Sequence, residues 1–259
     1  MTAGDRAGAR GIVLRTIPLR ESDLMVTLLT AEHGRISAVA RGARKSQRRF
    51  AGALQLLVLG RYQLSRSRGE LFTLEAADVE REWTTLASDV IAVAHASYVA
   101  EVAGAIVPPE QPEPEALELI VALWQSLAEG GPSPAALRFV ELYLLELAGH
   151  QSALDACAAC GRTELAGGVF DPTRGGAVCR ACAASSRGPG VRPLAPGTLA
   201  YLRAIAAAAS PSHARAIDGR FDAADRTSAR EALVAMVLEL VGKPLKSLEY
   251  IAKLARSKL

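Results

Sequence analysis

The chain has 259 residues, of which 50% are hydrophobic and 22% charged, and this composition excludes an intrinsically disordered protein. The net charge of +3 is too small to indicate a nucleic-acid partner by itself. Its distribution is more informative, because nine Lys or Arg residues and no Asp or Glu lie between Glu32 and Glu70.

Membrane and secretion signals are absent from the sequence. Apolar runs such as Leu119–Trp124, with six residues, and Ala232–Leu238, with seven, are far shorter than the stretch of about 18 that a membrane-spanning helix needs. The apolar stretch Ile12–Leu14 is too short for a signal-peptide core, and Arg15 follows it. We therefore expect a cytoplasmic protein without membrane contact.

The first 80 residues contain five short β-like segments separated by polar or Gly-containing turns. This pattern is typical of a small barrel, and a five-stranded OB-fold is the leading candidate, although periodicity alone does not separate it from an SH3-like barrel. Residues 1–9 are expected to be a frayed leader, and Ser67–Gly69 the turn of the last hairpin. The expected strands are Gly11–Ile17, Leu24–Thr30, Arg35–Ala40, Leu56–Leu64 and Leu71–Val79.

Beyond residue 83 the apolar residues change to a helical period. A stripe over Leu86–Ile106 predicts one continuous helix, which Pro108 ends. Ser133 followed by Pro134 is typical of an N-cap with proline in the first turn. The other expected helices cover Leu117–Leu127, Leu137–Leu147, Thr198–Ala209 and about Asp225–Val241.

The four cysteines form two close pairs, Cys157-x2-Cys160 and Cys179-x2-Cys182, with eighteen residues between them. Each pair presents two thiolates on a tight turn, and the intervening loop allows the pairs to form a tetrahedron around Zn²⁺. Thioredoxin-type redox motifs are the alternative, which the lack of a surrounding βαβ pattern disfavours. Four thiolates leave no open position, so we expect one structural zinc ion within residues 155–185.

These segments predict an α+β protein. A five-stranded OB-fold barrel for nucleic-acid binding is expected over residues 1–81. An all-helical domain is expected over residues 82–259, with the four cysteines in a zinc-ribbon-like insertion.

The segment after the third expected strand is strongly basic. Its five cations, beside Phe50, are typical of a surface that contacts a phosphate backbone, and three arginines of the next hairpin add to the same sign of charge. A solvated loop without a binding role is the alternative. Arginine is more frequent than lysine in the chain as a whole, so the preference for Arg in this loop is not evidence for phosphate binding. The predicted nucleic-acid-binding residues are Arg41, Arg44, Lys45, Arg48, Arg49, Arg61, Arg66 and Arg68.

No nucleotide-binding loop and no metalloprotease or hydrolase motif occurs in the sequence, and the carboxylates stand singly. We therefore expect a protein that is not an enzyme. Two other interpretations stay open: an RNA-binding OB-fold and zinc-ribbon module of translation or transcription, and an enzyme for which the ribbon is only a scaffold.

In this order, the parts of the chain resemble the RecO family of bacterial recombination mediators over nearly the whole length. At one place the chain departs from the family, because Leu54-Gln55-Leu56-Leu57 stands where the family has Leu-Gln-Pro-Phe. The segments that carry the resemblance, around the four cysteines, are Gly11–Leu14, Glu21–Asp23, His33-Gly34, Ala40–Lys45 and Lys243–Ser247.

The resemblance implies an OB-fold, a helical domain and a zinc site that some members of the family have lost. It implies binding to single- and double-stranded DNA, annealing of complementary strands, and loading of the recombinase RecA onto DNA coated with single-stranded-DNA-binding protein (SSB). It also implies RecR as a partner and a location at the nucleoid. The acidic, hydrophobic C-terminal tail of SSB is expected to bind the helical domain at Lys243, Leu245, Lys246 and Leu248.

Overall fold

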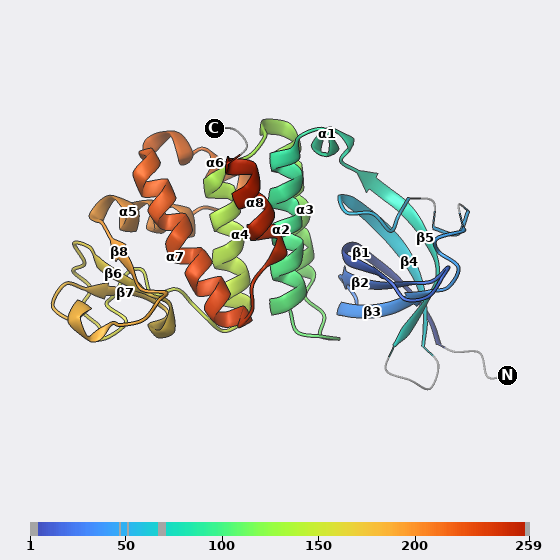
Figure 1. The fold of residues 1–259 in the computed structure, drawn as a ribbon, viewed down its shortest axis with the longest axis horizontal. Helices are drawn as coiled ribbons and strands as arrows, with labels where there is room; N and C mark the ends of the chain where they lie inside the picture. The colour runs from blue at the N-terminus through green and yellow to red at the C-terminus, as the bar shows by residue number, and fades with distance from the viewer. Residues whose placement is uncertain (1–4, 47, 51, 67–70, 257–259) are drawn as a thin grey trace. The chain divides into compact units, whose positions relative to one another are not determined.

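The computed structural model describes residues 5–46, 48–50, 52–66 and 71–256 (Figure 1). The chain forms two compact units. One runs up to Gly131 and takes in the chain from Tyr250 on, and the other spans Pro132–Glu249. The domain boundary expected between residues 81 and 82 stays a prediction. Every helix in the described part of the chain is too short or too polar to span a lipid bilayer.

The first unit contains a closed barrel of five strands in the order β1-β2-β3-β5-β4 (Figure 1). β1 pairs antiparallel with both β2 and β4, whereas β3 runs parallel to β5. This Greek-key closure is that of the OB-fold, so the predicted fold is confirmed over the SH3-like alternative. The strands are β1 (Asp5–Pro18), β2 (Leu24–Thr30), β3 (Gly34–Ala40), β4 (Val58–Arg66) and β5 (Phe72–Glu82).

The barrel closes around an apolar core because alternate residues of each strand point inward. β3 shows this most regularly, with buried and half-buried residues alternating along its length. β1 reaches both of its neighbours because a β-bulge between Val13 and Arg15 bends it. Buried core residues include Ala9, Val13, Val26, Leu28, Ile36, Ala38, Tyr62, Leu64, Leu74 and Ala77.

Two expectations about the barrel need comment. The frayed leader over residues 1–9 is wrong from Asp5 onward, because this stretch begins β1 and pairs with β4, Ala7 facing Leu64 and Ala9 facing Tyr62. The small residues of this segment predict a flexible tail, but hydrogen bonds to β4 satisfy its backbone N–H and C=O groups and hold it as a strand. The expected turn Ser67–Gly69 lies outside the described residues.

Three helices of the first unit follow the barrel. The single helix expected over Leu86–Ile106 is wrong, because Asp89 interrupts it. The Asp89 carboxylate accepts hydrogen bonds from the N–H groups of Ile91 and Ala92 at 2.9 and 3.2 Å and so caps a new helix. The helices are α1 (Thr84–Ala87), α2 (Val90–Ile106) and α3 (Pro114–Gly130).

The helices that follow the barrel contact the end of β5, and the connection between two of them contacts the start of β3. At the end of β5, the Trp83 indole N–H donates to Gln125 Oε1 of α3 at 3.0 Å. At the start of β3, Gly34 has a φ of +62°, and a Cβ there would lie 1.7 Å from the carbonyl oxygen of Gln111, in the connection between α2 and α3. Only glycine fits such a close backbone approach at positive φ.

The second unit consists of helices and a small antiparallel sheet in the order β7-β6-β8. The predicted start of its first helix is confirmed, since Ser133 Oγ accepts a hydrogen bond from the N–H of Ala136 at 3.1 Å and Pro134 follows. The short α6 and the C-terminal α8 do not figure among the expected helices. The elements are α4 (Pro134–Leu147), β6 (Gly168–Asp171), β7 (Gly176–Cys179), β8 (Arg192–Leu194), α5 (Pro196–Ala206), α6 (Pro211–Arg215) and α7 (Ala223–Val241). The last helix, α8 (Lys246–Arg256), begins in this unit, and its residues from Tyr250 on belong to the first.

Candidate metal centre and nucleic-acid interface

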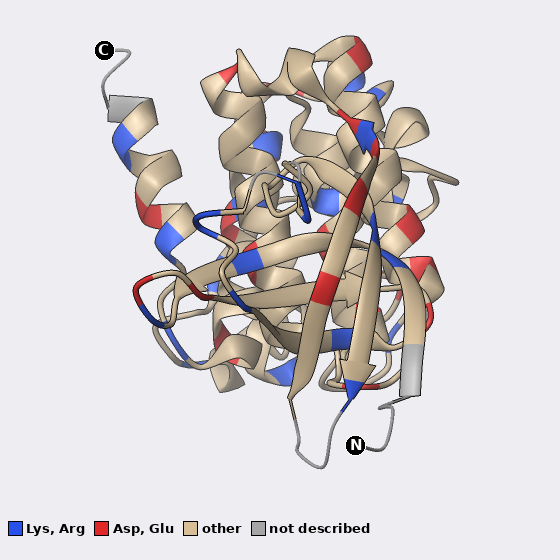
Figure 2. Cartoon of the chain, turned by 90° about the vertical axis from the view of Figure 1, so that its right-hand side faces the viewer, with Lys and Arg blue, Asp and Glu red and all other residues tan. Residues whose placement is uncertain are grey.

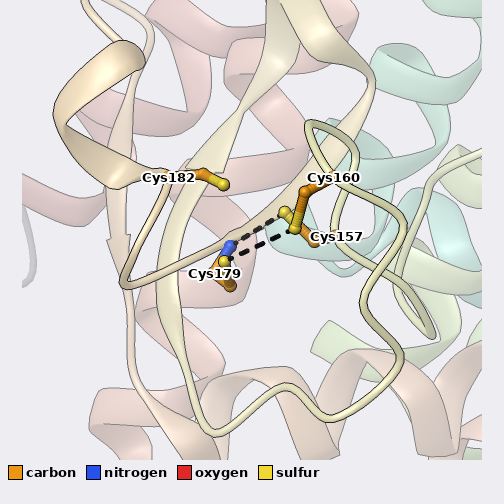
Figure 3. Close-up of side chains that lie close together, drawn as sticks. All are labelled: Cys157, Cys160, Cys179 and Cys182. Carbon is orange, nitrogen blue, oxygen red and sulfur yellow. Dashed lines mark hydrogen bonds between the residues drawn. The ribbon is translucent and has the colours of Figure 1, made fainter.

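The four cysteines meet at one end of the small sheet, and their sulfur atoms point toward one another (Figure 3). Cys179 is the last residue of β7, where it pairs with Gly168 of β6, and Cys182 follows in the next turn. The first pair, Cys157 and Cys160, comes from the segment before β6. We call residues 153–194 the metal module.

Backbone hydrogen bonds bring the first cysteine pair beside β7. The N–H of Ala177 donates to the oxygen of Ala153, and the N–H of Ala158 donates to the oxygen of Ala177, both at 2.8 Å. A Cβ at Gly176, whose φ is +154°, would lie 2.4 Å from the Ala153 oxygen, so glycine is needed for this approach. The pairing of β7 with residues 153–158 therefore sets the position of the first pair.

The distances between the sulfur atoms fit a tetrahedral thiolate site. All four lie within 4.8 Å of one another, and Cys160 Sγ is 4.0 Å from Cys179 Sγ. Zn–S bonds of about 2.3 Å would give S···S edges of about 3.8 Å in a tetrahedron. All four cysteines are free of disulfide bonds. The thiols can therefore hold one metal ion, and the antiparallel sheet beside them is not the βαβ setting of a thioredoxin-type motif.

The four thiols do not lose their protons equally readily. Burial acts to raise the pKa of Cys157, but N–H groups of Cys179, Ala159 and Cys160 donate to its sulfur and lower that pKa to about 6. Hydrogen bonding to Cys179 and Cys160, together with burial, raises the pKa of Cys182 to about 12. Four thiolates can share this space when a divalent cation offsets their charge.

A four-sulfur site of this kind has a structural rather than a catalytic geometry, because it leaves no open position for water or substrate. Cys157 and Cys179 are buried, Cys182 is half-buried and Cys160 is exposed. The two buried cysteines pack with Val178, and Val169 lies against this small cluster. A bound metal ion would complete this small cluster, in place of a larger core in the module.

The basic loop, Arg41–Arg49, is the first part of the connection between β3 and β4, and Gln47 within it lies outside the described residues. All five predicted cations in it are exposed to solvent. Among the described residues, the side chains of Arg41 and Arg48 make no hydrogen bond or ion pair, so both guanidinium groups are accessible to a ligand. Lys45 Nζ lies 3.1 Å from Glu21 Oε1.

The predicted arginines of β4 are already paired with carboxylates. Arg61 Nε lies 3.0 Å from Glu80 Oε2. Arg66 forms two hydrogen bonds to the Glu110 carboxylate, at 2.9 and 3.1 Å, and lies over the Phe72 ring. Figure 2 shows that basic and acidic residues are mixed on the strands, where blue Lys and Arg segments lie among red Asp and Glu segments. The predicted Arg68 lies outside the described residues.

The predicted partner-binding residues surround the start of α8. Lys243 and Lys246 are exposed and Leu248 is half-buried, whereas Leu245 is buried with 1% of its surface accessible. Leu245 is therefore a core residue in this structure. A partner at this place would meet the two lysines and Leu248 first.

A count of charges over residues 32–70 overlooks the turn between β1 and β2. Arg20 in this turn is exposed, and the turn contacts the basic loop through Glu21, Ser22 and Asp23. Leu19 beside it is also exposed, at 46%. The sequence signal was the Glu21-Ser22-Asp23 motif, whose position next to the basic loop follows only from the pairing of β2 with β3.

Comparison with known proteins follows the two parts of the chain. The family description "Recombination protein O N terminal" matches residues 6–82, and "Recombination protein O C terminal" matches residues 87–249. The chain is 43% identical over 254 residues to the DNA repair protein RecO of Anaeromyxobacter dehalogenans, with 95% of this chain and 96% of the relative covered. It is 32% identical over 242 residues to the DNA repair protein RecO of Myxococcus xanthus, with 93% and 95% covered.

Proposed function

The chain belongs to the RecO family of DNA repair proteins, and from that membership we propose that it is a recombination mediator and not an enzyme. In this proposal it binds single- and double-stranded DNA, anneals complementary strands and helps load the recombinase RecA onto SSB-coated DNA. The observation that carries the proposal is the basic loop, whose five exposed cations project from an OB-fold barrel.

Electrostatics gives a reason why such a loop would promote annealing. Two complementary strands repel each other through their phosphates, and exposed Arg and Lys side chains release counterions and lower this repulsion. The contacts are to phosphates, so binding should be largely independent of sequence. No nucleotide-binding motif occurs in the sequence, so we expect annealing to need no ATP.

We assign Zn²⁺ to the four-cysteine site, with Cys157, Cys160, Cys179 and Cys182 as its ligands. An all-sulfur donor set and the closed geometry favour zinc over harder cations. When bound, the ion would hold the two cysteine pairs together and stabilise the fold of the metal module.

The proposed partners besides DNA are RecR and the C-terminal tail of SSB, with RecA reached indirectly, at the nucleoid in the cytoplasm. An acidic, hydrophobic tail would meet Lys243 and Lys246, which are exposed, and Leu248, which is half-buried. Leu245 would support this surface from beneath, because it is buried.

An annealing assay tests the proposal. Complementary DNA strands are coated with intact SSB or with SSB lacking its C-terminal tail, and duplex formation is followed by fluorescence without ATP. We expect annealing of bare strands and of strands coated with intact SSB, and slower annealing with the shortened SSB. Equal rates with both forms of SSB would remove the tail from the mechanism. Failure to anneal bare strands, combined with tighter binding to RNA of the same sequence, would favour the RNA-binding alternative.

A further inference from the structure

The turn between β1 and β2, Leu19–Asp23, lies against the first half of the basic loop and supplies its hydrogen-bond acceptors. Asp23 Oδ1 accepts from the N–H of Gly42 at 2.8 Å. The oxygen of Ser22 accepts from the N–H of Arg44 at 3.1 Å. Glu21 accepts twice, its backbone oxygen from Arg44 Nη1 at 3.0 Å and its carboxylate from Lys45 Nζ at 3.1 Å.

We propose that Asp23 is a positioning residue for nucleic-acid binding: its carboxylate fixes Gly42 and thereby the direction in which Arg41 and Arg44 face the DNA backbone. The inference rests on the proposed function, in which the basic loop contacts phosphates. Asp23 is negatively charged and would repel a phosphate, so it is not itself a phosphate contact. The inference gives this residue of the Glu21–Asp23 motif a role in holding the loop.

The conformation of Gly42 shows what the carboxylate holds. Gly42 has a φ of +66°, in the left-handed region, and directs the chain from β3 into the loop. Its N–H is satisfied by the Asp23 side chain, while its oxygen accepts from the N–H of Lys45 at 3.1 Å. Without the Asp23 acceptor, the turn that orients Arg41 and Arg44 loses its side-chain anchor.

The surroundings of Asp23 keep it charged. The hydrogen bond from the Gly42 N–H lowers the pKa of Asp23 below its usual range, and Ser22, Arg20 and Arg41 act in the same direction. A bond from a backbone N–H to a charged acceptor is stronger than one to a neutral acceptor.

The second half of the loop has anchors that do not involve Asp23, and it also contacts the first half, because Arg49 Nη2 donates to the backbone oxygen of Arg41. The backbone oxygen of Arg49 accepts from the N–H of Ala77 in β5 at 2.8 Å, and the Arg49 guanidinium lies 5.1 Å from the centre of the Phe50 ring. Removal of the Asp23 carboxylate should therefore loosen the turn at Gly42, between Arg41 and Arg44, and leave the backbone of Arg49 in place.

The proposal predicts that removal of a negative charge near the basic loop weakens DNA binding. A carboxylate beside a phosphate-binding surface repels DNA, so charge alone predicts tighter binding when Asp23 is removed. Positioning predicts the opposite. Each lost phosphate contact on a single strand should flatten the salt dependence of log affinity by about 0.7 and, at 0.1 M salt, weaken binding about fivefold.

Three variants of the full-length protein separate these two effects, with single-stranded DNA binding measured across a salt series and backbone amide exchange measured at Gly42. Asp23→Ala removes both the charge and the acceptor. Asp23→Asn removes the charge and keeps an oxygen that can accept from Gly42. Glu21→Gln is the matched control, since it removes a neighbouring carboxylate charge and leaves the backbone acceptors unchanged.

We expect Asp23→Ala to weaken binding at least fivefold at 0.1 M salt, with a flatter slope and faster exchange at Gly42. Asp23→Asn and Glu21→Gln should bind as well as the parent protein or better. Tighter binding by Asp23→Ala would overturn the proposal, and so would weak binding by Asp23→Asn with Gly42 still protected. A thermal unfolding midpoint close to that of the parent shows that each variant is folded.

A further variant, Arg41→Ala/Arg48→Ala, separates this inference from the function on which it rests. If this double variant flattens the salt slope and Asp23→Ala does not, the positioning role alone is overturned. If the double variant leaves the slope unchanged, the basic loop is not the binding surface, and the inference fails together with it.

Discussion

The metal module and the basic loop present their functional side chains in opposite ways. In the module, four sulfur atoms converge within 4.8 Å, and backbone pairing with β7 fixes two of the cysteines. In the loop, five exposed cations are distributed along the chain, and contacts with the β1–β2 turn and β5 hold the backbone. A metal ion requires several atoms at one point, whereas a phosphate chain requires positive charge along a surface.

This difference separates what each region depends on. The module has a small apolar cluster around Val178, which a bound metal ion would complete. The loop is attached to a barrel with a large core of its own, so its function depends on which of its charges are unpaired. Four changes test this contrast, in order of decreasing expected effect.

Loss of a metal ligand should have the largest effect. We expect Cys157→Ser to lose zinc and to leave residues 155–185 open to proteolysis, since a structural zinc contributes on the order of 10 kcal/mol to local folding. The barrel should stay folded. Metal analysis and limited proteolysis measure both effects, and Thr163→Ala, at an exposed position in the same module, is the control. A zinc-free parent protein with a protected module would contradict the assignment.

The reverse experiment weakens the barrel and spares the metal. Gly34→Ala should lower the free energy of unfolding of the barrel by about 1–3 kcal/mol, because the new Cβ meets the Gln111 oxygen at a positive φ. Chemical denaturation measures the change, with zinc content expected to stay at the parent level. Gly8→Ala is the control, since no heavy atom lies within 4 Å of its new Cβ. Equal stability of the two variants would refute the steric argument.

Charge removal in the loop should change DNA binding and leave folding intact. If about four cations contact a single strand, the slope of log affinity against log salt should be near −3, and Arg41→Ala/Arg48→Ala should flatten it by about 1.4. Fluorescence anisotropy with labelled single strands measures the slope. Arg162→Ala/Arg180→Ala removes the same charge from exposed positions of the metal module and is the matched control. Equal flattening by both pairs would show that net charge, not the loop, governs binding.

The smallest effect is expected at Arg61. Its guanidinium is paired with Glu80, and Glu80 also lies 2.8 Å from Arg10, so Arg61→Ala leaves the carboxylate partly compensated. We expect a slope change well below the ~0.7 of one phosphate contact and a stability change of about 0–1 kcal/mol, as for other exposed ion pairs. The same anisotropy series measures it. A change as large as that of a loop arginine would mean that DNA displaces Glu80.

Much of the fold can be predicted from local patterns. The strand Leu24–Thr30 and the cap at Ser133 follow directly from alternation and capping chemistry. The break at Asp89 could not be distinguished from a continuous apolar stripe, because the stripe keeps its period across the capping residue. The strand from Asp5 depends on pairing with β4, which is more than fifty residues away along the chain, and the small residues of this segment give no local signal of that pairing.

The sequence by itself determined the chemistry of this protein: two cysteine pairs at metal-ligand spacing, a run of cations without nearby acids, and the order of parts that marks the family. These are properties of residue type and spacing. Only the tertiary structure decided which basic side chains are already paired with carboxylates. Glu80 and Glu110 lie in distant segments of the chain and pair with Arg61 and Arg66. It also placed Asp23 against Gly42, since strand pairing brings together backbone and side-chain groups that no local pattern connects.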